Sequence, residues 1–128
     1  MDERFYEHGL FSWNELMTTD VETAKKFYGE LLGWKMEDMS LKEVTYSVIQ
    51  AKGYDIGGIM TMPPGIAGTS PRWLPYVTVD AVDQTVQQAK PLGAQVIVPP
   101  TDIPEVGRFA ILKDPLGAKF AVITYPKK

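Results

Sequence analysis

The sequence predicts an α+β fold built from two tandem βαβββ modules, and three observations support this prediction. Two segments with apolar residues at helical spacing each follow a segment of alternating, strand-like character. Each helical segment ends at a glycine, after which the apolar pattern changes to a period of two. A connector rich in proline and glycine separates the halves. We expect one domain over residues 1–128, with module one at 8–62, a linker at 63–71 and module two at 72–126.

The first module is expected to open with a strand over residues 11–19, where the side chains alternate in character. Asp20 can cap the first free amides of a helix that runs to Leu32, with Thr19 as the alternative cap. Gly33 follows at the place where a left-handed C-cap residue is favoured. Three strands are predicted after it, over residues 34–39, 44–50 and 56–62.

The second module repeats this order with its own signals. A strand over residues 73–79 leads into a helix within residues 80–90, which Pro91 and Gly93 bring to an end. The turn at residues 114–117 has proline and glycine where turn geometry favours them. Three strands are predicted, over residues 95–98, 108–113 and 119–125. Since half a chain of about 55 residues is marginally stable alone, the modules are expected to form a single domain.

Composition excludes several classes of function. The 128 residues have a formal net charge of −3 and contain no cysteine, which removes thiolate catalysis, iron–sulfur clusters and cysteine zinc sites. The mild, scattered acidity offers no basic stripe for phosphates, so no nucleic-acid partner is expected. No apolar run approaches the ~18 residues of a membrane span, and the first residues lack the regions of a signal peptide. We therefore expect a soluble, cytoplasmic protein that does not interact with membranes.

Several short patterns follow one another along the chain: Ala24 and Phe27-Tyr28 after Asp20, the helix stop Leu32-Gly33-Trp34, and the late turn Asp114-Pro115-Leu116-Gly117. Together with the duplicated spacing, they resemble the vicinal oxygen chelate superfamily of glyoxalase I, bleomycin-resistance proteins, fosfomycin-resistance enzymes and extradiol dioxygenases. The resemblance covers residues 8–126 and is strongest to the glyoxalase-like group of small bacterial proteins. It implies curled mixed sheets that enclose a cleft, and a homodimer, because two-module members commonly pair.

The resemblance also implies metal-ligand positions that this chain does not fill with ligands. Metal-dependent members hold a divalent metal mostly through His and Glu on the first and last strands of each module. Carried over by position, these places fall on Trp13, on Leu74 or its neighbour Trp73, and on Ala121. The equivalent strand of module one, residues 57–60, also carries no donor, and none of these side chains is a usual metal ligand. We therefore expect a degenerate metal site, with no metal and no other cofactor.

Glu15 is the acidic side chain that we expect to point into the cavity and to carry any catalytic role. It lies two residues past Trp13, and Tyr76 lies two residues past Leu74, so each pair shares one face of its strand. Burying a carboxylate in apolar surroundings is costly and raises its pKa, although a partly exposed strand position is the alternative. A pocket lined by aromatic side chains suits a flat organic ligand. The predicted ligand-binding residues are Trp13, Glu15, Tyr46, Leu74, Tyr76, Phe109 and Ala121.

Three other features have ordinary structural explanations. His8 is the only histidine, and one histidine cannot make a metal site. Arg108 could reach a ligand carboxylate or phosphate, or it could pair with Glu105 or Asp102 on the surface. Gly57-Gly58 is too short for a phosphate loop and indicates a bulge or a close backbone approach.

Two classes of function remain open. The first is a small-molecule-binding protein that sequesters or carries a hydrophobic or aromatic compound without a metal, in the manner of bleomycin-resistance-like proteins. The second is a glyoxalase-like lyase or related enzyme that uses Glu15 as a general base, or an unusual metal site. A homodimer is expected in either case, because some apolar residues would be hard for one domain to hide: Phe5, Leu10, Phe11, Met60 and Met62.

Overall fold

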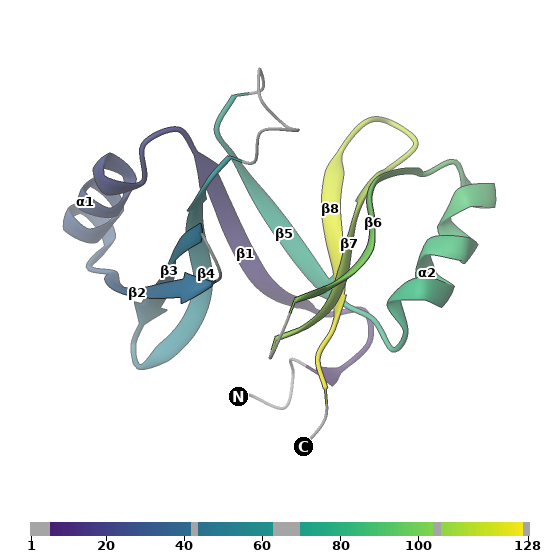
Figure 1. Cartoon of the computed structure of the whole chain (residues 1–128), viewed down its shortest axis with the longest axis horizontal. Coiled ribbons are helices and arrows are strands. Elements are labelled where there is room, and N and C mark those ends of the chain that lie inside the picture. The colour runs from purple at the N-terminus through teal and green to yellow at the C-terminus, as the bar shows by residue number, and fades with distance from the viewer. Residues whose placement is uncertain (1–5, 42–43, 63–69, 104–105, 127–128) are drawn as a thin grey trace. The chain divides into compact units, whose positions relative to one another are not determined.

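A computed structural model describes residues 6–41, 44–62, 70–103 and 106–126 (Figure 1). The chain divides into two compact units. One unit is the segment Trp13–Leu74, here called the α1 unit after its helix. The other, the α2 unit, combines the residues before Trp13 with those after Leu74. Helices among the described residues are all too short to cross a membrane.

The α1 unit contains the elements of the first predicted module. These are β1 (Phe11–Thr18), which enters the unit at Trp13, α1 (Val21–Leu32), β2 (Lys35–Leu41), β3 (Val44–Ala51) and β4 (Tyr54–Thr61). The strand order is β2-β3-β4-β1, in which β1 runs parallel to β4 and the other pairs are antiparallel. The pairing among these four strands is therefore mixed, with one parallel pair and two antiparallel pairs.

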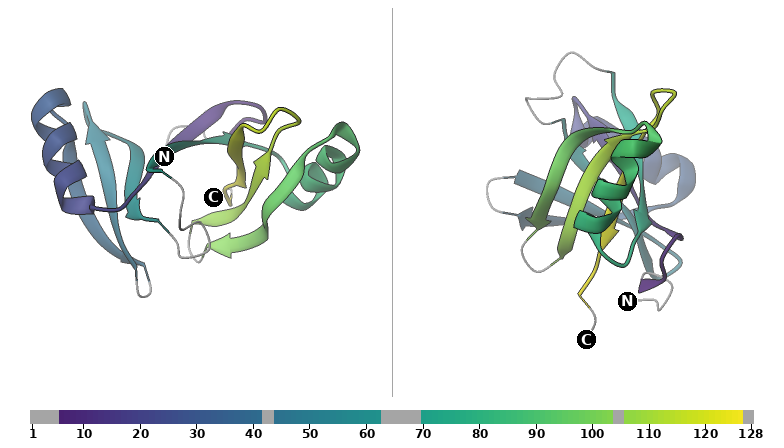
Figure 2. Two further views of the ribbon diagram at one scale, coloured as in Figure 1. Left: turned by 90° about the horizontal axis from the view of Figure 1, so that it is seen from above. Right: turned by 90° about the vertical axis from the view of Figure 1, so that its right-hand side faces the viewer.

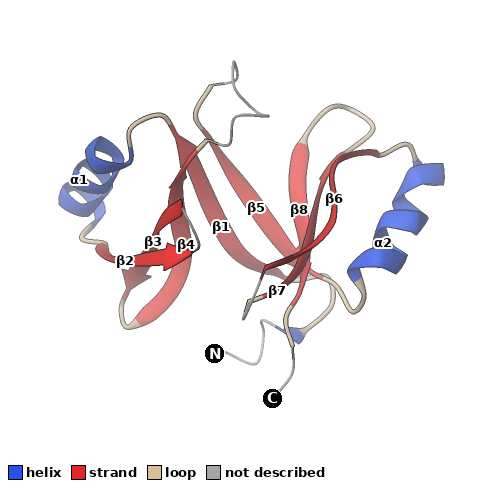
Figure 3. Cartoon of the chain, viewed as in Figure 1, coloured by secondary structure: helices blue, strands red, loops and turns tan. Residues whose placement is uncertain are grey.

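The α2 unit repeats this arrangement. Its elements are β5 (Arg72–Thr78), which enters the unit at Pro75, α2 (Val82–Ala89), the short 3₁₀ helix η3 (Lys90–Leu92), β6 (Gln95–Ile103), β7 (Gly107–Lys113) and β8 (Lys119–Thr124). The strand order is β5-β8-β7-β6, with β5 parallel to β8. The predicted α+β fold of two βαβββ modules is confirmed (Figure 3).

The predicted ends of the helices are largely confirmed. The Asp20 carboxylate accepts a hydrogen bond from the Thr23 amide at 3.1 Å, and Gly33 ends α1 in the left-handed region with φ 74°. Gly93 ends η3 in the same region with φ 99°. The second α-helix differs from the first, since its N-cap residue Ala81 has no side chain that could cap it.

Strand β6 runs five residues past the predicted end at Val98. It continues through Pro99 and Pro100, which cannot donate a backbone hydrogen bond to a neighbouring strand. The pairing of β6 with β7 shifts register on both sides of Val98, so bulges accommodate the prolines. The proline pair therefore interrupts the hydrogen bonding without ending the strand.

In the α1 unit the core lies on the face of the sheet that packs against α1. Leu16, Ile49 and Ile59 are buried there, against Val21 and Ala24 of the helix. Side chains alternate across a strand, so the neighbours of these core residues point to the other side of the sheet. We call this side the distal face of the α1 unit.

The α2 unit is organised in the same way. Ala110, Leu112 and Val122 are buried with Val82 and Val86 of α2, which lies along one face of the sheet (Figure 2). Alternation again defines a distal face, opposite the helix. In each unit, one face of the sheet thus packs against the helix and the other is the distal face.

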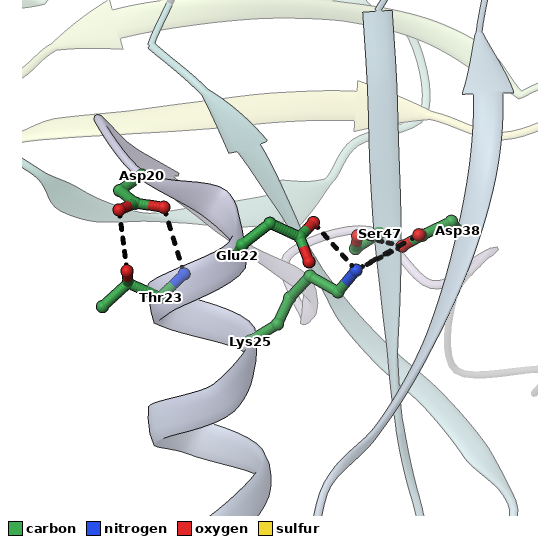
Figure 4. Close-up of polar contacts among 6 residues, drawn as sticks. All are labelled: Asp20, Glu22, Thr23, Lys25, Asp38 and Ser47. Atoms are coloured by element: carbon green, nitrogen blue, oxygen red, sulfur yellow. Dashed lines mark hydrogen bonds and ion pairs between the residues drawn. The ribbon is translucent and has the colours of Figure 1, made fainter.

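Lys25 ties α1 to its sheet through an ionic network (Figure 4). Its ammonium donates to both carboxylate oxygens of Asp38, at 3.0 and 3.1 Å, and to Glu22 at 3.2 Å. The Ser47 hydroxyl, which is fully buried, donates to Asp38 at 2.6 Å. These bonds, with that from Ser47 the strongest influence, hold the pKa of Asp38 below its ordinary value.

The Asp38→Asn variant is expected to be less sensitive to acid than the wild type. A carboxyl group with a lowered folded-state pKa stabilises the fold fully above its unfolded pKa, and this stabilisation is lost as pH falls through the folded value. We expect the urea midpoint of the wild type to fall more between neutral pH and pH 3 than that of Asp38→Asn. Ser47→Ala removes the largest cause of the lowered pKa and should behave similarly. Parallel pH profiles for wild type and Asp38→Asn would contradict this assignment.

Candidate functional site

The distal face of the α1 unit carries a short chain of hydrogen bonds. The indole Nε1 of Trp13 donates to the Tyr46 hydroxyl at 2.9 Å. That hydroxyl donates in turn to Glu15 Oε1, also at 2.9 Å. Glu15 is buried, with 8% of its surface exposed, whereas Trp13 and Tyr46 are half-buried. We call this arrangement the Trp13–Tyr46–Glu15 chain.

Tyr46 reaches Glu15 because a glycine lies between them. Glu15 on β1 and Val48 on β3 are both register partners of Gly58 on β4, so a whole strand separates β1 from β3. A Cβ atom built on Gly58 would overlap the ring and hydroxyl of Tyr46. The Tyr46 ring therefore crosses β4 over the one residue type that leaves room for it.

A Cβ atom added at Gly57 would overlap backbone, not a side chain. Gly57 is the register partner of Asn14, and the added atom would overlap the Asn14 carbonyl oxygen on β1. The close backbone approach predicted for Gly57-Gly58 is therefore present. The pairing of β3 with β4 also shifts register between Ile49 and Gln50, just beside this place.

The Trp13–Tyr46–Glu15 chain can bind a hydrogen-bond donor or move a proton. An ionised carboxylate can accept several hydrogen bonds at once, and Tyr46 donates one of them to Oε1. Because the Tyr46 hydroxyl accepts from Trp13, its single hydrogen is directed to Glu15. The two bonds fix the position of Glu15, so the carboxylate presents a defined acceptor on the sheet.

The corresponding positions of the α2 unit are apolar or aromatic. Tyr76 and Ile111 are both register partners of Ala121, as Glu15 and Val48 are of Gly58 in the other unit. Phe109 lies two residues before Ile111, as Tyr46 does before Val48. The rings of Tyr76 and Phe109 lie 6.5 Å apart at their centroids. In the α2 unit an aromatic pair thus takes the place of the Tyr46–Glu15 pair.

The predicted site residues therefore divide into two groups. Trp13, Glu15 and Tyr46 are joined by hydrogen bonds on the distal face of the α1 unit. Tyr76, Phe109 and Ala121 share the distal face of the α2 unit, and Leu74 precedes Tyr76 on β5. Leu74 and Ala121 are buried almost completely, so they contribute packing and shape.

The residues at the family's metal-ligand positions do not fit a divalent metal. An indole, an isobutyl and a methyl side chain occupy these places, at Trp13, Leu74 and Ala121, and Gly58 lies on the remaining strand. Divalent metals in proteins need nitrogen, oxygen or sulfur donors. Within the described residues, no three histidine or carboxylate side chains come together as a metal site would require.

Arg108 is bound to two aspartates of the α2 unit. Its guanidinium donates to Asp83 at 2.6 and 3.1 Å and to Asp102 at 2.9 Å. The surface-pairing alternative therefore describes this residue, with Asp83 as an additional partner; Glu105 lies outside the described residues. The bond to Asp83 is the main cause that raises the pKa of Arg108, and the same contact lowers the pKa of Asp83.

Two further predicted residues have structural contacts. His8 accepts a hydrogen bond from the Asp80 amide at 3.0 Å through Nδ1. Asp114 accepts from the amides of Leu116 and Ala118 at 2.9 Å each, as the predicted turn requires. These bonds lower the pKa of Asp114, with that from Ala118 first.

Trp34 and Trp73 lie apart from the Trp13–Tyr46–Glu15 chain. In the structure they belong to an aromatic cluster with Tyr28 of α1. Trp34 stacks on Tyr28 at 5.6 Å, and Trp73 donates to the Tyr28 hydroxyl at 3.3 Å. Since Tyr28 and Trp34 pack against the core beside α1, this cluster lies on the helix side of the sheet, away from Glu15.

Sequence reasoning missed the methionines of the α1 unit's distal face. Met17 follows Glu15 by two residues and is the register partner of Met60, which itself follows Gly58 by two. Met39 is the register partner of Tyr46. The spacing of two residues from Glu15 was the signal that could have identified Met17.

A family model described as the Glyoxalase/Bleomycin resistance protein/Dioxygenase superfamily matches residues 10–122. The chain is 40% identical over 116 residues to "Putative glyoxylase CFP32" of Mycobacterium tuberculosis, a match that covers 88% of this chain and 44% of that protein. It is 38% identical over 116 residues to "Anthracycline biosynthesis protein DauV" of Streptomyces sp., covering 90% of this chain and 41% of that protein. The chain thus spans less than half the length of these relatives.

Among solved structures, methylmalonyl-CoA epimerase from Mycobacterium tuberculosis superposes with a TM-score of 0.68 at 11% sequence identity. The superposition covers 93% of this chain and 89% of the epimerase chain. At this identity the likeness concerns the fold alone.

Proposed function

Because the chain belongs to the glyoxalase/bleomycin resistance protein/dioxygenase superfamily, we propose that it binds a small hydrophobic or aromatic compound without the superfamily metal. The Trp13–Tyr46–Glu15 chain carries the proposal. Glu15 is buried, and burying a carboxylate costs free energy unless hydrogen bonds compensate, so a carboxylate is kept at such a place for a reason other than packing. The α2 unit has Tyr76 at the corresponding place, so the fold itself does not demand an acid there.

The chemistry of the proposed ligand follows from this acceptor. Glu15 would accept a hydrogen bond from a hydroxyl, amine or amide of the ligand, while the half-buried rings of Trp13 and Tyr46 provide apolar contact. One relative at 38% identity is named for anthracycline biosynthesis, which agrees with an aromatic organic ligand.

A glyoxalase-like enzyme is the second candidate. The observation that favours it is the fixed geometry of Glu15, whose carboxylate could take a proton from a carbon acid while Tyr46 holds it in place. A relative at 40% identity is named as a glyoxylase. The donor set at Trp13, Leu74 and Ala121 does not support a metal-dependent version of this chemistry.

The Glu15→Gln variant separates these functions. The amide keeps the shape of the side chain and removes its charge, so a bound donor compound should be held about 1–3 kcal/mol more weakly. The measurement is the thermal shift caused by a panel of alcohols, amines, amides and phenols in wild type and variant. If the protein is the enzyme, Glu15→Gln should abolish lactoylglutathione formation from glutathione and methylglyoxal, with little loss of binding.

Glu37→Gln is the matched control, because Glu37 is exposed on β2 of the same sheet. It should leave every thermal shift unchanged. If no compound in the panel stabilises the wild type more than Glu15→Gln, the proposed binding site is wrong.

We also expect a homodimer. Phe11 is 74% exposed and Leu10 is exposed, whereas Met60 and Met62 are half-buried and Phe5 lies outside the described residues. Phe27 and Leu31 of α1, which fit its apolar pattern in the sequence, are exposed as well. Exposed apolar area of this kind is typical of an interface. Light scattering at micromolar concentration should give twice the 14.3 kDa of one chain, and a mass of 14.3 kDa would speak against the dimer.

A further inference from the structure

The methionines of this chain are concentrated on one surface. Of the six in the sequence, four lie at or beside the distal face of the α1 unit: Met39 on β2, Met60 on β4, Met62 directly after β4 and Met17 on β1. Met36 packs on the opposite side, with the core beneath α1, and Met1 lies outside the described residues. The thioethers therefore gather on the face that also carries Glu15.

These side chains form a gradient of exposure around the Trp13–Tyr46–Glu15 chain. Met17, two residues after Glu15, is 3% exposed, and its register partner Met60 is half-buried. Met39, the register partner of Tyr46, is 44% exposed. A molecule that contacts Met39 and Met60 would therefore lie beside the Tyr46 ring.

The helix side of the α1 unit carries one methionine, Met36, and the sequence after Leu74 contains none. The helix side of the same sheet is filled by Leu16, Ile49 and Ile59. In the α2 unit, the positions that correspond to the register partners Met17 and Met60 hold Thr78 and Ile123. Hence the repeat does not require a thioether at these places.

Methionine differs from the aliphatic residues in properties that matter for binding. Its side chain is unbranched and flexible, so it adapts to ligands of irregular shape. Its polarisable sulfur makes favourable contacts with aromatic rings. Aliphatic residues with better-defined rotamers serve a core better. A methionine-rich face therefore favours contact with an aromatic ring.

We propose that the distal face of the α1 unit binds the planar ring system of a phenol. The ring lies against Met60 and Met39, and the phenolic hydroxyl donates to Glu15 beside Tyr46. A neutral hydroxyl makes a short, strong bond to a carboxylate and escapes the desolvation cost of an ammonium ion. The negative charge of Glu15 disfavours carboxylate and phosphate ligands. This proposal rests on the proposed function and narrows its ligand class.

Three probe compounds distinguish the contribution of the aromatic ring to binding from that of the hydrogen-bond donor. 1-Naphthol has both, 1-methoxynaphthalene has the ring without the donor, and decahydro-1-naphthol has the donor without the aromatic ring. Titration calorimetry on the full chain should show 1-naphthol binding at least tenfold more tightly than either analogue. In Glu15→Gln, the affinities for 1-naphthol and 1-methoxynaphthalene should become equal within about twofold.

The methionines are tested by a matched pair of substitutions. Met60→Leu keeps the volume and removes the sulfur, so 1-naphthol should bind about two- to tenfold more weakly while decahydro-1-naphthol is unaffected. Met36→Leu makes the same change on the helix side of the sheet and should leave both affinities unchanged. Urea unfolding of each variant confirms that it is folded.

The outcomes separate this proposal from the function on which it rests. Equal affinity for 1-naphthol and decahydro-1-naphthol, or equal effects of Met60→Leu and Met36→Leu, would overturn the proposal that this face binds an aromatic ring. If alcohols or amines bind in a Glu15-dependent way and 1-naphthol does not, the phenol assignment is wrong and the proposed function stands. If no donor compound binds in a Glu15-dependent way, the proposed function itself fails.

Discussion

Replacing Gly57 with Ala is expected to destabilise the protein by about 3 kcal/mol, although alanine in a strand is normally more favourable than glycine. The added methyl group would overlap the carbonyl oxygen of Asn14 on β1. This obstacle is backbone, so β1 and β4 must separate where they are register partners. The free energy of unfolding in urea measures the effect. A variant as stable as the wild type would show that the strands tolerate the separation.

Gly58→Ala, one residue further along, is expected to act through a side chain. The three atoms nearest to an added Cβ all belong to Tyr46, so the ring must swing away and break its bonds to Trp13 and Glu15. We expect a loss of about 1–3 kcal/mol, because a buried carboxylate loses a hydrogen bond. The compounds that stabilise the wild type should no longer do so.

A double-mutant cycle distinguishes the two glycines. In a Tyr46→Ala background the ring is gone, so Gly58→Ala should cost nothing or stabilise the chain by about 0.5–1 kcal/mol. Gly57→Ala should keep its full penalty in the same background, because Asn14 is still there. If Gly58→Ala costs as much without the Tyr46 ring as with it, the ring does not explain the glycine.

The sequence was sufficient to predict the elements of the fold, because the signals for them are local. Asp20 caps its helix through a residue three positions away, and Gly33 ends that helix in the conformation that glycine favours. The predicted end of β6 at Val98 was wrong, because prolines such as Pro99 and Pro100 are typical of the end of a strand. The bulges that accommodate them depend on pairing with β7, which no local pattern shows.

The candidate site was only partly predictable for the same reason. Alternation along β1 was enough to place Trp13 and Glu15 on one face. The bond from Tyr46 to Glu15 depends on the register of three strands and on the absence of a side chain at Gly58. Pairs separated by 31 residues in sequence leave no periodic signal in a single chain. The metal-free character expected from Trp13, Leu74 and Ala121 stays a prediction.

The path of the chain through the two units sets the order in which they can be completed during synthesis. The α1 unit uses only the continuous segment Trp13–Leu74, so all of it exists before α2 has been translated. Residues before Trp13 belong to the α2 unit, where the Ser12 hydroxyl pairs with that of Tyr125, 113 residues later. Translation adds about 5–20 residues per second, so Tyr125 is synthesised roughly 6–23 s after Ser12. The ribosome therefore releases the two similar modules to fold in sequence, and the second closes only when β8 has been made.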